Sequence, residues 1–222
     1  MTRQLAAPSP GANLRRLVAV VPVGALEGAK SRLGGSLDAE ERQDLVQLLL
    51  ERTIRAAAQV AQIESVVVVS PDPAILELAV RAGAMPLQQV GAGLNEGLDQ
   101  AVEWAIAQGA SAVLVLAADL PSVSAESIGE IVATAAAAAS PERAIVVVVP
   151  DRHGRGTNAL LLSPPDAIGF SFGVDSRTAH EAAARAADAL SVEVDGPLAL
   201  DLDLPEDLTL AEERGLLDPT RG

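Results

Sequence analysis

The sequence predicts a three-layer α/β/α sandwich built on a mostly parallel β-sheet. Two observations carry this prediction: short runs of strand length alternate with longer helical segments, and each run contains several consecutive apolar residues. A strand that is apolar on both faces is typical of a parallel sheet covered by helices on both sides. Strand–helix–strand repeats with right-handed crossovers generate this architecture. The 222 residues, 49% of them hydrophobic, are enough for one such domain.

The strands are expected at four apolar runs: residues 17–23, 63–70, 111–118 and 144–149. The first helix is expected over 37–60, with Ser36 as its N-cap and acidic residues in its first turn, where the helix dipole favours anions. Further helices are expected over 73–81, 95–108 and 125–139, the second ending at Gly109 and the third before Pro141.

After residue 150 the alternation loosens. A glycine-rich turn over 151–157 precedes a short apolar run at 158–162, a Phe-Gly loop, a helix near 175–190 and a last helix over 205–214. No linker or repeat divides the chain, so residues 14–222 are predicted to form one domain. Residues 1–13, rich in Pro, Gly and Ala, are predicted to be a disordered leader.

Composition excludes several classes of function. The chain has 16 basic and 30 acidic side chains and a net charge of −14, which argues against nucleic acid and anionic membranes as partners. It has no Cys and two His, which leaves no disulfide, thiolate zinc site or Cys nucleophile. No apolar stretch approaches 18 residues, and the run after Arg15-Arg16 is too short for a signal peptide. A cytoplasmic protein is predicted.

The only lysine of the chain, Lys30, lies in the segment GALEGAKSRL directly after the first predicted strand. This segment nearly fits the phosphate-binding loop G-x-x-x-x-G-K-[ST], but Ala29 replaces the second glycine and Gly34-Gly35 interrupt the helix that should follow. The spacing better suits a different mode of nucleotide binding, in which backbone amides contact the phosphates and Lys30 and Arg32 neutralise their charge. The alternative is a solvated turn with incidental cations.

Two acidic positions are candidate metal ligands. Asp119 ends a wholly apolar strand, where a carboxylate costs free energy unless it is solvated, hydrogen-bonded or metal-bound. Mg²⁺ prefers one or two carboxylates together with substrate phosphates. The paired acids Asp201 and Asp203 could present one carboxylate to a metal while the other faces elsewhere. The alternatives are a turn aspartate at 119 and an acidic helix start at 201–206.

Two glycine-hydroxyl segments, Gly154–Thr157 and Gly173–Ser176, are typical of cradles for small anions, because backbone N–H groups need close access there. The overlapping GFSFG at 169–173 matches the hydrolase elbow G-x-S-x-G, but no long strand precedes it and no suitable triad follows. His153 and His180 are predicted to be surface or loop histidines.

Six motifs in order carry a resemblance: VVPVGALEGAKSRL, GLNEGL, VLVLAADLP, HGRGTNALLL, FGVDS and DLDLPEDL. From residue 17 to 210 the chain resembles the guanylyltransferases of coenzyme F420 biosynthesis. These transfer GMP from GTP to 2-phospho-L-lactate or phosphoenolpyruvate and release pyrophosphate. The resemblance implies a Rossmann-like fold of the nucleotide-diphospho-sugar transferase type, Mg²⁺ as cofactor, and GTP and a small phosphorylated acid as partners. The acceptor, with 3-phosphoglycerate as a third candidate, and a homodimer stay open.

The resemblance also implies roles for individual residues. GTP would be held by Lys30, Ser31, Arg32, Asn95 and Gly97; Mg²⁺ by Asp119 and Asp203; and the acid by Thr157, Gly173 and Ser176. Catalysis would rest on Lys30, Arg32 and Asp119. One position departs from the family, which usually has Lys where this chain has Gly24. A phosphate-loop NTPase and a non-catalytic nucleotide-binding protein remain as alternatives.

Overall fold

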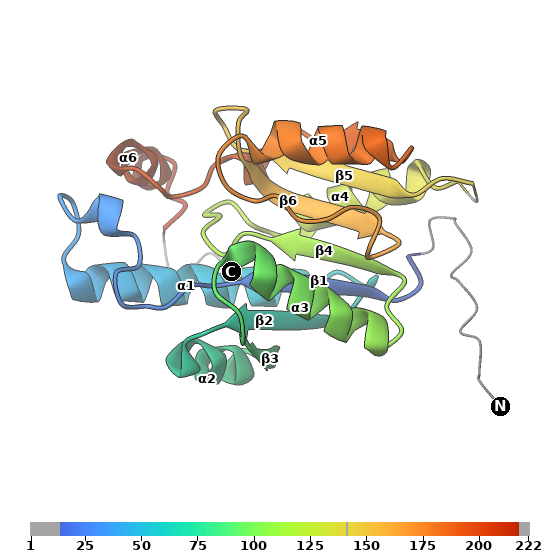
Figure 1. Cartoon of the computed structure of the whole chain (residues 1–222). Coiled ribbons are helices and arrows are strands. Elements are labelled where there is room, and N and C mark those ends of the chain that lie inside the picture. The colour runs from blue at the N-terminus through green and yellow to red at the C-terminus, as the bar shows by residue number, and fades with distance from the viewer. Residues whose placement is uncertain (1–13, 141, 218–222) are drawn as a thin grey trace.

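The computed structural model describes residues 14–140 and 142–217. Within them, seven strands form one sheet in the order β3-β2-β1-β4-β6-β5-β7 (Figure 1). Strand β6 is antiparallel to both its neighbours, and all the other pairings are parallel. The strands are β1 (Leu17–Pro22), β2 (Ile63–Ser70), β3 (Met85–Gln88), β4 (Ala112–Leu116), β5 (Ile145–Pro150), β6 (Thr157–Ser163) and β7 (Leu190–Glu193).

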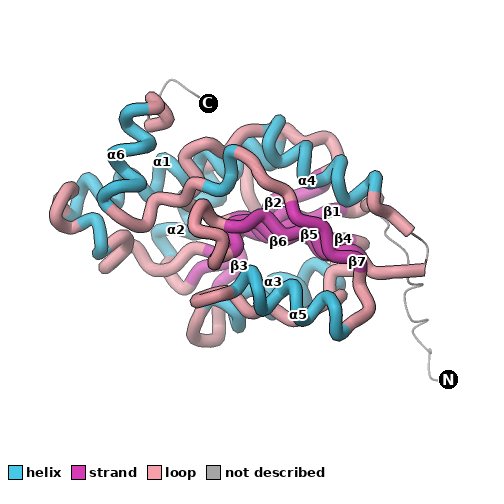
Figure 2. Tube along the Cα trace, turned by 90° about the horizontal axis from the view of Figure 1, so that it is seen from above, coloured by secondary structure: helices cyan, strands magenta, loops and turns pink. Residues whose placement is uncertain are grey.

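Helices cover both faces of the sheet (Figures 1 and 2). Helices α1 (Ala39–Ala58), α2 (Pro73–Arg81) and α4 (Ala125–Ala137) pack on one face, and α3 (Leu94–Ala107) and α5 (Ser176–Ala186) on the other. The last helix, α6 (Pro205–Glu213), packs on the first half of α1 through a separate leucine cluster. The predicted three-layer α/β/α sandwich with a mostly parallel sheet is therefore confirmed.

The continuous apolar runs are explained by burial on both faces. In β1, Leu17 and Ala19 belong to the core under α1, α2 and α4, whereas Val18 and Val20 belong to the core under α3 and α5. Each of these four side chains is at most 4% exposed. Because alternate residues of a strand point to opposite faces, a strand in the middle layer needs apolar residues at every position.

Three expectations about the elements are corrected. The N-cap of α1 is Asp38, not Ser36, because Asp38 and Glu41 form a reciprocal capping box that uses two otherwise unpaired N–H groups. The edge strands β3 and β7 were not predicted, since each has only four residues and neither is a continuous apolar run. The run at 158–162 is the antiparallel strand β6 in the middle of the sheet.

The predicted leader, residues 1–13, lies outside the described residues. None of the helices formed by residues 14–140 and 142–217 is long and apolar enough to cross a membrane.

The topology brings several strand ends to one edge of the sheet. The carboxyl ends of β1, β4 and β5 lie there, together with the beginning of the antiparallel β6, since Ala117 donates a hydrogen bond to the Asn158 carbonyl. Ligands of open α/β sheets bind at this edge. Three of the motifs singled out above lie at this edge: those of Lys30 and Asp119 follow β1 and β4, and Thr157 begins β6.

Candidate functional site

A lysine bound to two carboxylates forms the centre of the site. The Lys30 ammonium donates hydrogen bonds to Asp119 Oδ2 and, over 3.0 Å, to Asp203 Oδ1. Arg32 adds a looser contact, with 3.5 Å between its guanidinium and Asp203 Oδ2. The structure thus brings together four residues, from three distant parts of the sequence, that were predicted to bind GTP or Mg²⁺. Ser31 lies beside them and is exposed.

The backbone around Lys30 holds its side chain over the sheet edge. Lys30 has a φ of 51°, in the left-handed region that costs a non-glycine residue free energy and occurs often at functional sites. A one-turn 3₁₀ helix, Ser31–Leu33, follows, and its Leu33 is fully buried. On the other side, the Leu26 N–H donates to Asp72 Oδ2 over 2.9 Å, while Asp72 also caps α2. The segment is therefore anchored at both ends.

Asp203 is positioned by the start of α6. The backbone N–H groups of Asp203 and Leu204 both donate to Asp207 Oδ2, over 3.2 and 2.7 Å. Asp207 is 2% exposed and forms an ion pair with Arg152 at 2.6 Å. The Leu202 N–H donates to the Asp119 carbonyl, which ties this segment to the end of β4. Asp119 and Asp203 consequently meet at Lys30.

A third carboxylate, Asp201, lies close to the other two. Burial, and then the charges of Asp119 and Asp203, raise the pKa of the Asp201 carboxyl to about 6. The Asn158 amide donates to Asp201 Oδ1 over 3.5 Å and to the carbonyls of Leu198 and Ala199 over 2.9 and 3.0 Å. Of the alternating acids in DLDLP, only Asp203 was predicted from the sequence to be a metal ligand.

The electrostatics of this cluster favour a cation. Burial alone would lower the pKa of the Lys30 ammonium, but the neighbouring charges of Asp119 and Asp203 raise it above its usual value. The ammonium thus lies between two carboxylates, and the Asp201 carboxyl lies near those two. Within residues 14–140 and 142–217, no three acidic or histidine side chains are already grouped around a vacant metal position. Lys30 itself lies between Asp119 and Asp203.

The predicted substrate residues Thr157 and Ser176 also come together, at the start of β6 and the start of α5. Ser176 Oγ donates to Thr157 Oγ1 over 3.3 Å, and both residues are buried. Thr157 pairs with Pro150 and Ala159 with Val149, so Asn158 is the extra residue of a β-bulge. Bulges redirect side chains. Here Thr157 contacts α5, whereas Asn158 contacts the 198–201 segment.

His180 corrects a prediction. It is fully buried in α5, not a surface or loop histidine. Its Nδ1 is 3.1 Å from Thr157 Oγ1, its Nε2 accepts a hydrogen bond from the Ser171 N–H, and its ring meets Phe172 edge-on at 4.9 Å. The α5 pattern gave a signal for this, because His180 lies four residues after Ser176 on the same helix face.

The remaining predicted residues lie around this group. Gly173 has a φ of 130°, which glycine adopts without strain. The Asn95 side chain accepts from the Phe172 N–H and donates to the Phe172 carbonyl, so α3 is joined to the loop before Gly173. A Cβ on the buried Gly97 would come within 2.8 Å of the Gln89 side chain. The roles of Asn95 and Gly97 in nucleotide binding stay predictions.

Burial of His180 predicts a pH dependence of stability. Burial lowers the pKa of His180 from 6.5 to about 4, so the unfolded chain takes up a proton at a higher pH than the folded chain does. Stability is therefore lost as the pH falls from about 6.5 toward 4. At pH 5 this amounts to roughly 2 kcal/mol. Urea unfolding at pH 7.5 and 5 should show a larger loss for the natural chain than for His180→Gln. The exposed His153 gives the control, because His153→Gln should keep the full loss; an equal loss in all three proteins would contradict the prediction.

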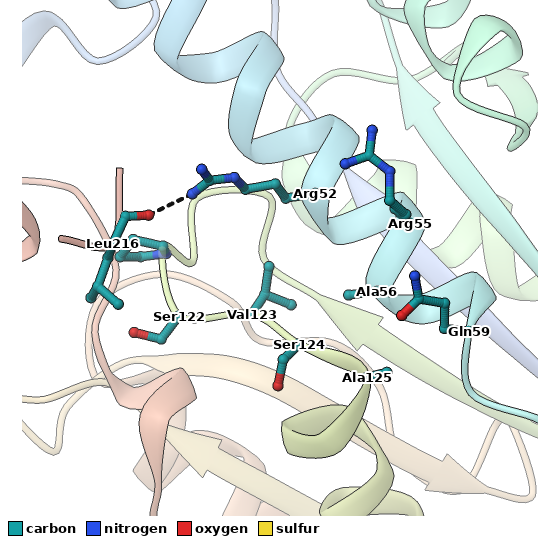
Figure 3. Close-up of a pocket in the computed structure, with 10 residues that line it drawn as sticks. Arg52, Arg55, Ala56, Gln59, Ser122, Val123, Ser124, Ala125 and Leu216 are labelled. Atoms are coloured by element: carbon teal, nitrogen blue, oxygen red, sulfur yellow. Dashed lines mark hydrogen bonds between the residues drawn. The ribbon is translucent and has the colours of Figure 1, made fainter. Parts of the chain in front are cut away.

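A cavity of about 360 Å³ lies away from these residues, between α1, α4 and the C-terminal segment (Figure 3). Arg52, Arg55 and the 121–125 loop line it, and Arg52 donates a hydrogen bond to the Leu216 carbonyl. The two arginine side chains point in different directions. None of the predicted site residues lines this cavity, so the open sheet edge is the stronger candidate site.

Known structures share this fold. A protein from Desulfovibrio desulfuricans described as a nucleotide-diphospho-sugar transferase matches with a TM-score of 0.71 and 17% identity, over 92% of this chain and 89% of its own. A 4-diphosphocytidyl-2C-methyl-D-erythritol synthase from Anaerococcus prevotii matches with a TM-score of 0.60 and 12% identity, over 91% and 99%. The predicted fold type, that of the nucleotide-diphospho-sugar transferases, is thereby confirmed.

Sequence comparison identifies the family. Two proteins named phosphoenolpyruvate guanylyltransferase are similar to this chain. The one from Sphaerobacter thermophilus is 46% identical over 86% of this chain and 90% of its own length, and the one from Rubrobacter xylanophilus is 43% identical over 89% and 94%. The family model described as "Guanylyl transferase CofC like" matches residues 17–212, which include both the carboxylate cluster and the hydroxyl pair. The chain therefore belongs to the CofC-like guanylyl transferases.

Proposed function

We propose that this protein transfers GMP from GTP to phosphoenolpyruvate. The observation that carries the proposal is the lysine-carboxylate cluster of Lys30, Asp119 and Asp203 at the same edge of the sheet as the Thr157–Ser176 hydroxyl pair. The first group suits a nucleoside triphosphate with its cation, and the second suits a small anion. The relatives named phosphoenolpyruvate guanylyltransferase support the choice of both substrates.

The proposed reaction is an in-line nucleotidyl transfer. An oxygen of the acceptor's phosphate forms a bond to the α-phosphorus of GTP, while the bond from that phosphorus to the bridging oxygen breaks. The electron pair of the broken bond leaves with pyrophosphate. The attacking oxygen is already anionic, so no general base is required. This agrees with a site whose histidine, His180, has both ring nitrogens engaged in hydrogen bonds.

The chain's own residues would position the reactants and stabilise charge. Lys30 and Arg32 would bind triphosphate oxygens, because both cations already lie at the carboxylates where the nucleotide is proposed to bind. Thr157, Ser176 and the backbone at Gly173 would hold the acceptor. Holding two substrates in line and countering the charge on the transferred group accounts for large rate accelerations without acid–base chemistry.

The residues present also fit a divalent cation. Asp119, Asp201 and Asp203 supply only oxygen donors, which Mg²⁺ prefers, and the two cations Lys30 and Arg32 do not balance three carboxylates. The raised pKa of Asp201 has this excess of negative charge among its causes. When bound, Mg²⁺ would neutralise phosphate charge and polarise the phosphoryl oxygens. We assign Asp119 and Asp203 as ligands.

The geometry does not favour a phosphate-loop NTPase. In such a loop the lysine opens a long helix whose N-terminus faces the phosphates. Lys30 instead precedes a single 3₁₀ turn, and α1 begins only at Ala39. We further propose that residues 14–222 act as one guanylyltransferase domain in the cytoplasm.

An acceptor panel tests the proposal. Purified protein is mixed with GTP, Mg²⁺ and either phosphoenolpyruvate, 2-phospho-L-lactate or 3-phosphoglycerate. Pyrophosphate is followed in time and the nucleotide product is identified by mass spectrometry. We expect pyrophosphate and a guanylylated product with phosphoenolpyruvate. Release of inorganic phosphate and GDP would instead indicate an NTPase, and GTP binding without turnover would indicate a nucleotide-binding protein.

Gly24 gives a prediction about nucleotide affinity. A Cβ built on Gly24 meets no atom within 4 Å, so a lysine there has room. A charge-assisted contact to a phosphate contributes about 1.5 kcal/mol or more, so Gly24→Lys should lower the KM for GTP about tenfold. The KM for the acceptor should stay the same. The uncharged variant Gly24→Gln is the matched control, and an equal effect from both variants would contradict an electrostatic cause.

A further inference from the structure

His180 is tied to the proposed acceptor site by hydrogen bonds on both sides of its ring. Its Nε2 accepts from the Ser171 N–H and its Nδ1 lies 3.1 Å from Thr157 Oγ1. Its surroundings are Phe172 and the apolar core under α5, and its side chain is fully buried. The proposed reaction leaves this histidine without a role, although it touches a residue proposed to hold the acceptor.

The backbone decides which nitrogen of His180 carries the proton. A backbone N–H can only donate, so Nε2 must offer its lone pair to Ser171. A neutral imidazole has one N–H, which therefore lies on Nδ1 and donates to Thr157 Oγ1. Protonation of the ring would place a hydrogen on Nε2, and two donors, Nε2–H and the Ser171 N–H, would then face each other without an acceptor. Burial agrees with this, since it lowers the pKa of His180 to about 4 and keeps the ring neutral near pH 7.

The proton on Nδ1 orients the hydroxyl pair. A hydroxyl oxygen accepts two hydrogen bonds, and Thr157 Oγ1 accepts one from His180 and one from Ser176 Oγ. The Thr157 proton is then left to point elsewhere. If the bond between the two hydroxyls is reversed, the proton left over belongs to Ser176. In both arrangements one hydroxyl proton of the pair is left to be donated to a ligand, because His180 Nδ1–H already donates to Thr157 Oγ1.

The loop over this group is fastened from the opposite side. The Asn95 amide forms two hydrogen bonds with the Phe172 backbone, at 2.9 and 3.1 Å, and this holds Ser171 and Phe172 against α5. The Ser171 N–H that sets the His180 tautomer is thus part of a fixed loop. Thr157 in turn lies at the sheet edge beside the end of β4, where Ala117 bonds to Asn158.

We propose that His180 is a positioning residue for the acceptor: as the Nδ1–H tautomer it makes the Thr157–Ser176 pair a hydrogen-bond donor to an anionic oxygen of phosphoenolpyruvate. The inference rests on the proposed function, because it takes these hydroxyls to bind the acceptor. A donor is what a carboxylate or phosphate requires, since such groups only accept hydrogen bonds when ionised.

Two amide variants test separately the hydrogen bonds made by the two ring nitrogens of His180. The side-chain nitrogen of asparagine takes the place of Nδ1, so His180→Asn keeps a donor toward Thr157 and loses the contact with Ser171. The longer glutamine reaches the place of Nε2, so His180→Gln keeps an acceptor for Ser171 and loses the donor to Thr157. A merely structural role would not distinguish these variants by acceptor affinity, and thermal unfolding of each shows whether it is folded.

The experiment is a double-mutant cycle on binding and turnover. The Kd for phosphoenolpyruvate is measured by calorimetry, and the KM values for both substrates by pyrophosphate release, for the natural chain, His180→Gln, Thr157→Val and the double variant. We expect His180→Gln to weaken phosphoenolpyruvate binding about tenfold, the loss typical of one hydrogen bond to a charged group. His180→Asn should restore most of it, and the KM for GTP should stay unchanged. The exposed His153→Gln is the control.

The cycle separates the two proposals. Because His180 acts through Thr157, the double variant should bind phosphoenolpyruvate as Thr157→Val does. Additive losses, or equal losses in His180→Asn and His180→Gln, would overturn the inference and leave the proposed function standing. A natural chain that binds phosphoenolpyruvate without releasing pyrophosphate would overturn the function alone. A natural chain that does not bind it would overturn both.

Discussion

Replacing Lys30 with methionine is expected to slow guanylyl transfer by about 10²–10³-fold, the loss typical of removing one preorganised electrostatic group from a transition state. Methionine keeps the length and the apolar stem of the side chain but removes the ammonium that contacts Asp119 and Asp203. The loss should appear in kcat and in the KM for GTP, because the proposed contacts are with the triphosphate. The KM for phosphoenolpyruvate should change little.

The same variant should reveal the excess of negative charge at the site. Without the ammonium, the Asp119 and Asp203 carboxylates face each other with no cation bonded between them. Removing one partner of a buried ion pair costs several kcal/mol, but these carboxyl side chains are 25% and 47% exposed, so about 1–2 kcal/mol is expected. Mg²⁺ should restore part of this loss. The rise in melting temperature with Mg²⁺ should therefore be larger for Lys30→Met than for the natural chain.

Lys30→Arg is the matched control for charge. A planar guanidinium does not reproduce the compact ammonium that bonds to two carboxylates at once, so turnover should fall while most of the stability remains. If Lys30→Arg matched the natural chain in turnover, the position would require only a positive charge. If Lys30→Met retained full turnover, the assignment of Lys30 to the triphosphate would be wrong.

The middle of the fold was predictable because its strands are buried on both faces. The runs around Val20, Val115 and Val148 are apolar at consecutive positions, and Val66–Val69 continue this pattern in β2, as a parallel middle layer requires. The edge strands β3 and β7 lack this pattern, since an edge is only partly covered. The reversal of β6 could not be predicted, because strand direction depends on how its neighbours pair and not on its composition.

The candidate site was predictable where a residue type was rare or out of place. Lys30 is the only lysine, and Asp119 ends an apolar strand. His180 was missed because its position on the same helix face as Ser176 does not show what covers that face, and its burial follows from the loop that Asn95 holds over it. The position of Asp201 near Asp119 and Asp203 could not be predicted, because alternation along the chain does not show that two acids two residues apart both lie at the cluster.

Asp119→Asn is expected to abolish Mg²⁺-dependent turnover, with a loss of about 10²–10³-fold or more. Asparagine has nearly the same shape, so the end of β4 and the bond from Leu202 N–H to the residue 119 carbonyl should persist. What changes is charge: the cluster loses a carboxylate that bonds to Lys30 and is proposed to bind Mg²⁺. Asp203→Asn should have a smaller effect, because the Asp203 side chain is 47% exposed and that of Asp119 25%.

The exposed Asp188 provides the comparison. Its side chain is 92% exposed and pairs with Arg143 before β7, at the opposite edge of the sheet, so Asp188→Asn should retain the turnover of the natural chain. Titration with Mg²⁺ in the presence of GTP, followed by the melting temperature, separates metal binding from catalysis. A fully active Asp119→Asn would exclude this aspartate as a metal ligand. If Asp119→Asn lost turnover but kept the whole Mg²⁺-dependent rise in melting temperature, Asp119 would act through Lys30 and not through the metal. The Lys30 ammonium would then have lost the carboxylate that holds it toward the triphosphate.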